Sequence, residues 1–298
     1  MSFLDDRAGL AGRCAAIVGG ASGIGAAVSL ALARAGVDVA LLDINASAVP
    51  ATVQQIQATG RRALGTVGDA CDVAALEGFY REVGMTFGRL DMVVNVAGGT
   101  LQKKFMDMDR ADIERDVRRN YTYVLDSVRL AVPLIRRGGR GGSIVNFTTI
   151  EAHRGAAGFS VYAGAKAALT NFTRALAVEL GGEGIRVNTL VPDTTPSEGN
   201  ANALPEPLRS KMAAVPMAAM MQNLGMYVPL KAPPMPENLA DGVLFLVSDL
   251  AKFVTGTALH VDGGTMAAAG FLEWPHGEGH LPVAAPTSAI KLFGDGES

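Results

Sequence analysis

The 298-residue sequence predicts an α/β fold: a Rossmann-like, doubly wound parallel sheet of about seven strands with helices on both faces. Three observations predict it. Short aliphatic and β-branched runs alternate with longer helical patterns, these short runs are apolar on both faces, and a glycine-rich loop follows the first of them. Strands that are apolar on both faces belong to a parallel sheet that helices cover on both sides.

The elements are expected in a regular order along the chain. Strands are predicted in CAAIVG (14–19), VDVALLD (37–43), RALGTV (62–67), LDMVVNVAG (90–98), SIVNFTT (143–149), IRVNTLVP (185–192) and TALHVDGG (257–264), the last strand. Helices are predicted in GIGAAVSLALARAG (23–36), ASAVPATVQQIQATG (46–60) and DVAALEGFYREVGMTFG (72–88), from about Asp109 to Arg137, and from about Ser160 to Leu180. No Pro- or Ser-rich linker divides this block, which predicts one dinucleotide-binding catalytic domain over residues 1–265 and a C-terminal extension over 266–298.

Composition excludes several classes of protein. The net charge is −3, from 26 Lys and Arg against 29 Asp and Glu, which gives no electrostatic footprint for nucleic acid or an anionic membrane. No run approaches the ~20 apolar residues of a membrane span, and the acidic N-terminus is unlike a signal peptide. Cys14 and Cys71 are expected to be reduced thiols in a cytoplasmic protein. The two histidines of HGEGH (276–280) are interpreted as part of a solvated tail, and no metal site is expected.

The loop VGGASGIG (18–25) joins the first strand to the first helix. Glycines at Gly19, Gly23 and Gly25 let the backbone turn tightly and approach a pyrophosphate at the helix N-terminus. The alternative is a tight turn without a ligand, but the strand–turn–helix position favours a dinucleotide. Asp43 ends the second strand, where its carboxylate can accept both adenosine ribose hydroxyls and repel a 2′-phosphate. No Arg or Lys occurs in GASGIG (20–25) or in DINAS (43–47) to bind such a phosphate, so the sequence predicts NAD rather than NADP.

Tyr162 and Lys166 lie four residues apart on one face of the helix that begins at about Ser160. A phenol titrates near 10, so a tyrosine that acts as a base near neutral pH needs its pKa lowered by roughly three units. A nearby ammonium and an oxidised nicotinamide can supply that shift. The alternative is a packed core tyrosine beside a lysine that extends to solvent.

Taken together, these motifs resemble the short-chain dehydrogenase/reductase family, in its single-domain NAD-dependent branch. The resemblance runs from about Gly12 to Gly264. It rests on an ordered set of motifs: VGGASGIG, Asp43, CDV (71–73), NVAG (95–98), Asn120, YAGAK (162–166) and TGTALHVDGG (255–264).

The resemblance implies roles for single residues. Tyr162 is the general acid/base, and Lys166 lowers its pKa and holds the nicotinamide ribose. Thr149 stands where the family usually has serine, and Asn120 holds a water in the proton path. The cofactor-binding residues implied are Gly19, Ser22, Gly23, Ile24, Gly25, Asp43, Asp72, Val73, Asn95, Ala97, Gly98, Tyr162, Lys166, Val191, Pro192 and Thr194. The substrate residues implied are Thr149, Glu151, His153 and Tyr162.

The sequence departs from the family pattern at Val18, Val96, Asp193 and Ser197. Val18 replaces a threonine and removes a hydrogen bond between the first and fourth strands, which predicts slightly lower stability there. Asp193 follows Pro192 in place of a glycine, next to the expected nicotinamide position. These departures keep open the alternative of a catalytically weak NAD-binding sensor or scaffold. A sugar-nucleotide epimerase is disfavoured, because such relatives resemble GxxGxxG and carry a larger C-terminal domain.

The expected activity is that of an NAD-dependent oxidoreductase that interconverts a hydrophobic secondary alcohol and its ketone. By resemblance, residues 193–236 form a lid over the substrate. Six methionines stand there, which favours an adaptable apolar pocket over a site for a sugar or a CoA thioester: Met212, Met217, Met220, Met221, Met226 and Met235. The resemblance also implies a homotetramer, with a dimer as the alternative.

Overall fold

The computed structural model describes residues 3–193, 195, 206, 210–211, 214–274 and 279–282. Its centre is a parallel sheet with the strand order β3-β2-β1-β4-β5-β6-β7. The strands are β1 (Cys14–Val18), β2 (Asp38–Asp43), β3 (Ala63–Val67), β4 (Met92–Asn95), β5 (Gly142–Phe147), β6 (Ile185–Pro192) and β7 (Ala258–Val261). Seven parallel strands confirm the predicted sheet; six fall inside their predicted segments, and β5 begins one residue before its segment, at Gly142.

The strand order reverses between β1 and β4, which are adjacent in the sheet but separated in the chain by β2 and β3. Ligands of open α/β sheets bind at such a switch point, outside the carboxyl ends of the strands. The glycine loop follows β1 at this switch point. The topology therefore places the loop at the position where the dinucleotide is predicted to bind.

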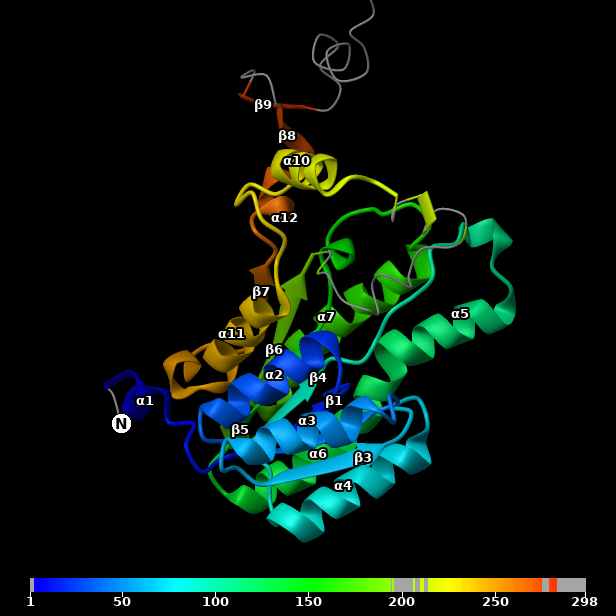
Figure 1. The fold of residues 1–298 in the computed structure, drawn as a ribbon. Helices are drawn as coiled ribbons and strands as arrows, with labels where there is room; N and C mark the ends of the chain where they lie inside the picture. Colours follow the sequence, from blue (N-terminus) through cyan, green and yellow to red (C-terminus); the bar gives the residue numbers. More distant parts are fainter. Residues whose placement is uncertain are drawn as a thin grey trace, which may run out of the picture.

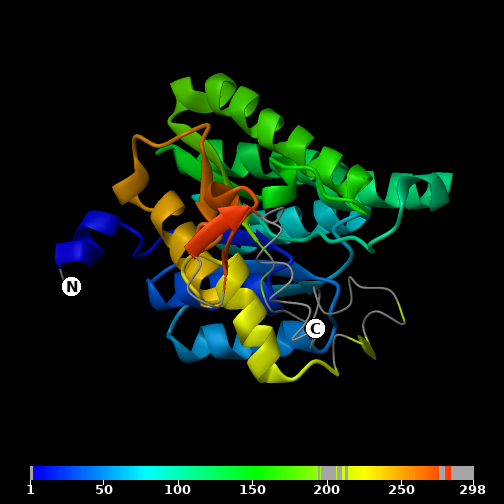
Figure 2. The same ribbon diagram turned by 90° about the horizontal axis from the view of Figure 1, so that it is seen from above.

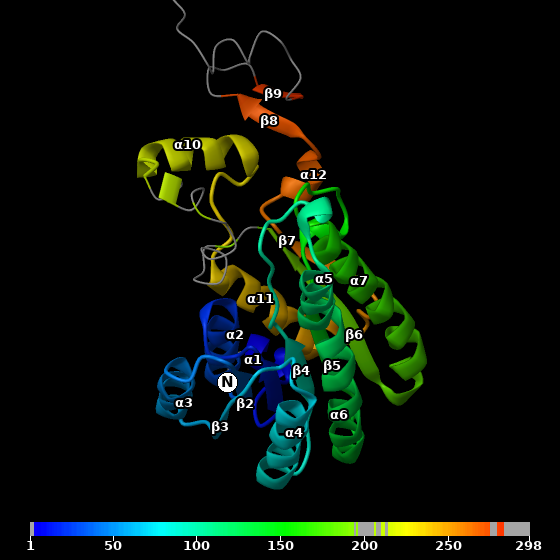
Figure 3. The ribbon, with the colours of Figure 1, turned by 90° about the vertical axis from the view of Figure 1, so that its right-hand side faces the viewer.

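Helices cover both faces of the sheet (Figures 1 and 3). On one face lie α2 (Gly23–Arg34), α3 (Ala48–Ala58) and α11 (Pro236–Val247), and on the other α4 (Val73–Phe87), α6 (Tyr123–Gly138) and α7 (Ser160–Leu180). The short helix α1 (Phe3–Ala8) precedes β1. Each face of the sheet buries its own hydrophobic cluster. The two layers explain why the strands are mostly apolar on both faces.

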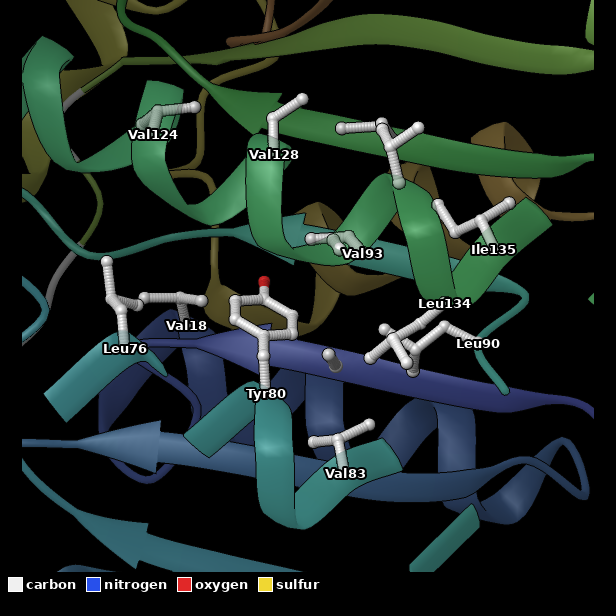
Figure 4. Packing of buried hydrophobic residues seen from close by; sticks show 14 of the residues in the cluster. Val18, Leu76, Tyr80, Val83, Leu90, Val93, Val124, Val128, Leu134 and Ile135 are labelled. Carbon is white, nitrogen blue, oxygen red and sulfur yellow. The ribbon is translucent and has the colours of Figure 1, made fainter. Parts of the chain in front are cut away.

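Figure 4 shows the packing between α4 and α6. Leu76, Tyr80 and Val83 of α4 pack opposite Val128 and Ile135 of α6, above the strands β1 and β4. The phenol of Tyr80 lies 2.7 Å from the Ser127 hydroxyl, which satisfies the one polar group that this tyrosine brings into the core.

The helix predicted from Asp109 to Arg137 is not uniform. It consists of α5 (Arg110–Val117), a π-helical segment η2 (Arg118–Thr122) and α6. A capping box between Asp109 and Asp112 starts it. The predicted long helix is therefore present as one continuous helical run, and no feature of the sequence indicated its wider π turn at residues 118–122 around Asn120.

Short 3₁₀ turns connect other elements: η1 (Phe105–Asp107), η3 (Ile150–Ala152), η4 (Gly181–Glu183) and η5 (Asp249–Ala251). Beyond the sheet lie α10 (Met217–Tyr227), α12 (Thr265–Ala268) and an antiparallel hairpin of β8 (Phe271–Trp274) and β9 (Gly279–Pro282). The prediction that β7 is the last strand was wrong, because this hairpin follows it. Seen from above, α10 and the hairpin lie over the sheet (Figure 2).

The predicted lid and extension are described only in part. Of the lid, Met212 lies outside the described residues, whereas the other five methionines lie inside them. Of the extension, residues 275–278 and 283–298 lie outside, including His276 of the HGEGH segment. An ion pair between Lys231 and Glu273 links the segment after α10 to β8.

Candidate active site

The predicted site residues follow the carboxyl ends of adjacent strands. The glycine loop follows β1. Asn95 is the last residue of β4, and Ala97 and Gly98 lie in the loop after it. Thr149 follows β5, and Pro192 ends β6. Because all strands of the sheet are parallel, these loops meet at one edge. The fold therefore brings together residues as far apart in the sequence as Gly19 and Pro192, which are 173 positions apart.

Two glycines of the loop leave no room for a side chain. Gly19 has a φ of +82°, and a Cβ there would lie 2.7 Å from the Ala97 nitrogen. A Cβ on Gly25 would lie 1.7 Å from the Gly19 carbonyl oxygen. Gly23 has a φ of +50° and begins α2, with Ser22 as its N-cap residue. This is a cradle of backbone N–H groups at a helix N-terminus, which suits a pyrophosphate. Ile24 of the same loop packs partly buried against the core.

Asp43 is buried at the end of β2 and ties two turns together. Its Oδ2 accepts a hydrogen bond from the Ala21 backbone N–H at 2.8 Å, and its Oδ1 accepts one from that of Asn45 at 3.0 Å. A carboxylate has about four acceptor positions, so two remain for ribose hydroxyls. A hollow beside it is lined by Ala21, Ser22, Gly23, Asn45, Ser47 and Ala48. None of these lining residues is cationic, so the residues present fit a ribose with free hydroxyls and offer nothing to a 2′-phosphate.

The other predicted cofactor residues differ in what they contact. Asp72 caps α4 by accepting from the Ala74 N–H at 3.0 Å, and Val73 beside it is 41% exposed, available to a ring. Asn95 is fully engaged with protein: its Oδ1 accepts from Ser127 at 2.7 Å and its Nδ2 donates to Asn146 at 2.9 Å. Its side chain therefore fixes β4 against β5 and α6.

Tyr162 on α7 lies beside Thr149. Burial and then the charge of Glu151 raise the pKa of Tyr162 to about 12, although the nearby Thr149 side chain acts to lower it. The phenol is therefore protonated at neutral pH. The sequence predicts that Lys166 and a bound nicotinamide lower the pKa of Tyr162. Neither is among the groups that shift this pKa here, so the lowering would need positive charge from a bound cofactor.

Lys166 is buried one turn further along α7, with 3% exposure. Its ammonium donates to the Phe147 carbonyl at 2.8 Å, and burial lowers its pKa to about 8. A Cβ on Gly98 would lie 3.2 Å from Lys166 Nζ and 3.0 Å from Asn120 Oδ1. A side chain at position 98 would therefore crowd both the lysine and the asparagine.

Asn120 lies at the centre of the π-helical segment and is fully buried. Its Nδ2 donates to the carbonyls of Asp116 at 2.9 Å and Gly99 at 3.0 Å, and its Oδ1 accepts from the Gly99 N–H at 3.0 Å. In a π turn the backbone N–H reaches the carbonyl five residues back, so the side chain takes up the carbonyl four residues back instead. Asn120 thereby joins the helix to the loop after β4.

Glu151 connects Thr149 to residues that the sequence analysis missed. The Thr149 hydroxyl donates to Glu151 Oε2, and Arg154 Nη2 donates to Glu151 Oε1 at 2.9 Å. The Arg154 guanidinium lies 5.8 Å from the centre of the Tyr227 ring on α10, and Tyr227 also hydrogen-bonds with Asp193. Arg154 could have been found from the sequence, because it stands three residues after the oppositely charged Glu151. No feature of the sequence pointed to Tyr227.

The remaining predicted residues are His153 and the residues at the end of β6. His153 packs against His260 of β7 with 5.0 Å between ring centres, and burial, then His260, lowers its pKa. Val191 and Pro192 end β6, and Asp193 is buried. Thr194 lies outside the described residues.

Comparison with known proteins agrees with this geometry. A family model described as enoyl-(acyl carrier protein) reductase matches residues 19–266. An L-rhamnose 1-dehydrogenase (NAD(P)(+)) of Sphingomonas sp. strain SKA58 is 32% identical over 256 residues, 86% of this chain and 96% of that protein. The chain belongs to the short-chain dehydrogenase/reductase family. The resemblance inferred from the sequence motifs is confirmed.

Solved structures of this family match the whole sheet and its helices. A 7α-hydroxysteroid dehydrogenase in complex with NADH and 7-oxo glycochenodeoxycholic acid has a TM-score of 0.78 and 30% identity, over 89% of this chain and 98% of that one. Carveol dehydrogenase from Mycobacterium avium, in complex with NAD, has a TM-score of 0.79 and 28% identity, over 86% and 98% of the two chains. Dehydrogenases that act on alcohols thus share this fold.

The described part of the chain has neither a membrane-spanning helix nor a candidate metal cluster. None of its helices is both long and apolar enough to cross a membrane. Within the same residues, no group of three or more His, Cys, Asp or Glu side chains is arranged to hold a metal ion.

Proposed function

We propose that this member of the short-chain dehydrogenase/reductase family is an NAD-dependent oxidoreductase that interconverts a hydrophobic secondary alcohol and its ketone. The observation that carries the proposal is the contact between Tyr162 and Thr149, with Lys166 buried on the same helix, at the edge where the glycine loop lies. Two hydroxyl groups side by side can hold one substrate oxygen between them.

The cofactor proposed is NAD. The glycine cradle at Gly19 and Gly25 would hold the pyrophosphate, Asp43 would accept from the adenosine ribose, and Val73 would lie against the adenine. Lys166, which approaches Gly98 closely, would hold the nicotinamide ribose. When bound, NAD supplies the hydride acceptor for the carbinol carbon.

The proton is handled by the protein's own groups. With its pKa near 12, Tyr162 is a poor base until positive charge lowers that pKa. Lys166, with a pKa near 8, is close to half protonated at mildly alkaline pH, and any anion beside it raises its proton affinity. We infer that the Tyr162 phenolate takes the alcohol proton and that Lys166 carries it onward, through a water that Asn120 would hold. Oxidation should therefore accelerate as pH rises from neutral towards 9.

The apolar substrate is supported by α10, which lies over the sheet. Its Met217, Met220 and Met221 are 69%, 38% and 45% exposed. Methionines adapt to irregular apolar shapes. The steroid and carveol dehydrogenases of similar fold act on such molecules, although the L-rhamnose relative acts on a sugar. An alternative is that these methionines only pack the helix onto its neighbours.

NADH absorbance at neutral and alkaline pH tests the proposal against a panel of alcohols. The panel contains a bulky alicyclic alcohol, a polyol and an acyl-CoA. The highest kcat/KM is expected for the alicyclic alcohol, and a clear preference for the polyol or the CoA ester would reject the apolar pocket.

A second candidate is a catalytically weak NAD-binding sensor or scaffold. One observation favours it: the Thr149 hydroxyl donates to Glu151 and not to an open substrate position, and Glu151 raises the pKa of Tyr162. Tight NAD binding without turnover of any alcohol in the panel would support this candidate.

A further inference from the structure

The carboxylate of Glu151 lies next to the hydroxyl that should hold the reacting oxygen. Glu151 belongs to the 3₁₀ turn η3 directly after Thr149, and its side chain is 18% exposed. Oε2 accepts from the Thr149 hydroxyl and Oε1 accepts from Arg154 at 2.9 Å. A carboxylate offers about four acceptor positions, so two are left after these bonds.

The position of this carboxylate works against the proposed chemistry unless it has a role of its own. Its negative charge raises the pKa of Tyr162, which makes the phenolate harder to form. A Gln or Ala at this position would avoid that effect. Arg154 pairs with Oε1 of Glu151, whereas Oε2 faces Thr149. The Arg154 guanidinium also lies over the ring of Tyr227.

The geometry fits a second oxygen on the substrate. The reacting oxygen should lie within hydrogen-bond reach of both Tyr162 and Thr149, and Glu151 lies one hydrogen bond beyond Thr149. The two oxygens of a gauche vicinal diol are separated by about the length of an O–H···O hydrogen bond. A hydroxyl on the carbon next to the carbinol therefore reaches Glu151 while the first hydroxyl stays at Tyr162.

We propose that the preferred substrate is an alicyclic vicinal diol, whose second hydroxyl donates to the carboxylate of Glu151. This proposal rests on the proposed function and narrows its substrate class. Arg154 is a positioning residue: it holds the carboxylate, and Tyr227 of α10 holds Arg154. The remainder of the ring would lie on the side of α10, the helix that carries Tyr227.

An anionic substrate group fits this site poorly. Arg154 is the cation that contacts Glu151, and Asp193 adds a second carboxylate through its contact with Tyr227. A carboxylate or sulfonate on the substrate would compete with Glu151 for Arg154 and leave like charges together. A neutral hydroxyl that donates its proton avoids this cost.

The test compares kcat/KM for cis- and trans-1,2-cyclohexanediol with that for cyclohexanol. For the unmodified protein, the better diol isomer is expected to exceed cyclohexanol about ten- to a hundredfold, the range of one hydrogen bond to a charged group. In Glu151→Leu this ratio should fall to near one. Glu151→Gln, which keeps an acceptor oxygen without the charge, should give an intermediate ratio. NADH binding, followed by fluorescence, shows that each variant is folded.

The matched control is Glu183→Gln. Glu183 forms a comparable pair with Arg136 at 2.6 Å, next to the amino end of β6 and away from the site, so the ratio should not change. A ratio near one in the unmodified protein, or an undiminished ratio in Glu151→Leu, would overturn the inference while leaving the alcohol oxidoreductase in place. If neither these alcohols nor the wider panel is oxidised although NADH binds, the proposed function falls and the inference falls with it.

Discussion

At the scale of single residues, the pair formed by Tyr162 and Thr149 decides whether the protein catalyses proton transfer. Tyr162→Phe removes the proton carrier and should lower the rate by several orders of magnitude, while NAD affinity stays within a few-fold. Thr149→Ala should lose less, about 10²-fold, because it removes one hydrogen bond to the substrate oxygen. Thr149→Ser keeps the hydroxyl and should remain active. Steady-state rates and cofactor titrations check all three, and a Tyr162→Phe variant with most of its activity would refute the assignment.

The carboxylate of Asp43 should decide the choice between NAD and NADP. Asp43→Asn removes the charge that opposes a 2′-phosphate, while its amide oxygen can still accept the backbone bonds from Ala21 and Asn45. We expect NADP to gain roughly 10-fold or more in affinity relative to NAD, the effect of losing one unfavourable charge contact. Titration with both cofactors measures this. Equal affinities in the unmodified protein, or a preference that the variant does not change, would contradict the role of Asp43.

Lys166 should cost stability at neutral pH. Its folded-state pKa, near 8, lies below the ordinary value of 10.5, so the unfolded chain binds more protons between these two values and stability rises with pH across this window. The shift corresponds to at most about 3 kcal/mol. Lys166→Met should therefore be more stable than the unmodified protein at pH 7, with the difference shrinking by pH 10. Thermal melts at both pH values measure it. A variant that is less stable at pH 7 would show that the bond to the Phe147 carbonyl matters more than burial.

Among the helices and strands, the π-helical segment η2 should affect both stability and catalysis, because it carries Asn120. Asn120→Ala leaves the carbonyls of Asp116 and Gly99 and the N–H of Gly99 without their side-chain partner. Such buried losses cost about 1–3 kcal/mol each when no water replaces them. We expect a lower melting temperature together with a lower kcat. A control variant, Arg118→Ala, changes an exposed side chain of the same segment and should affect neither to this extent.

The regular elements could be predicted because their signals are local. The strands are apolar on both faces, and Gly88 and Gly139, both at positive φ, end helices α4 and α6. The π turn could not be predicted, since it depends on Asn120 bonding to Gly99 across the chain. The contact between Arg154 and Tyr227 likewise joins segments 73 positions apart, and only the folded chain brings them together.

At the scale of the whole molecule, a buried polar network runs beneath the site. Ser127 bonds to Tyr80 and Asn95, Asn95 to Asn146, and Asn146 to Thr173 of α7. Every bond lies between 2.7 and 2.9 Å, so the chain of partners is satisfied and fixes α4, α6 and α7 on the sheet. It explains why Asn95, which the family pattern assigns to the cofactor, is held so firmly by the protein. It also positions the helix that carries Tyr162 and Lys166.

The molecule exposes apolar side chains where the family resemblance implies partner subunits. Val178 on α7 is 83% exposed, Phe253 after η5 is fully exposed, and β7 is an edge strand of the sheet. Edge strands and exposed apolar side chains are commonly covered by a partner. We therefore predict a homotetramer, in which the helices that carry Asn120 and Lys166 form one interface and β7 meets its own copy in another.

Light scattering should give a mass four times the 30.8 kDa of one chain. Val178→Asp places a charge in the predicted helical interface, where its desolvation is unfavourable, and should leave dimers that still meet through β7. Met85→Asp serves as the control, because Met85 is 72% exposed on α4, outside both predicted interfaces, and its variant should remain tetrameric. A monomer of the unmodified protein would overturn the prediction. A dimer that Val178→Asp leaves intact would instead assign the single interface to β7.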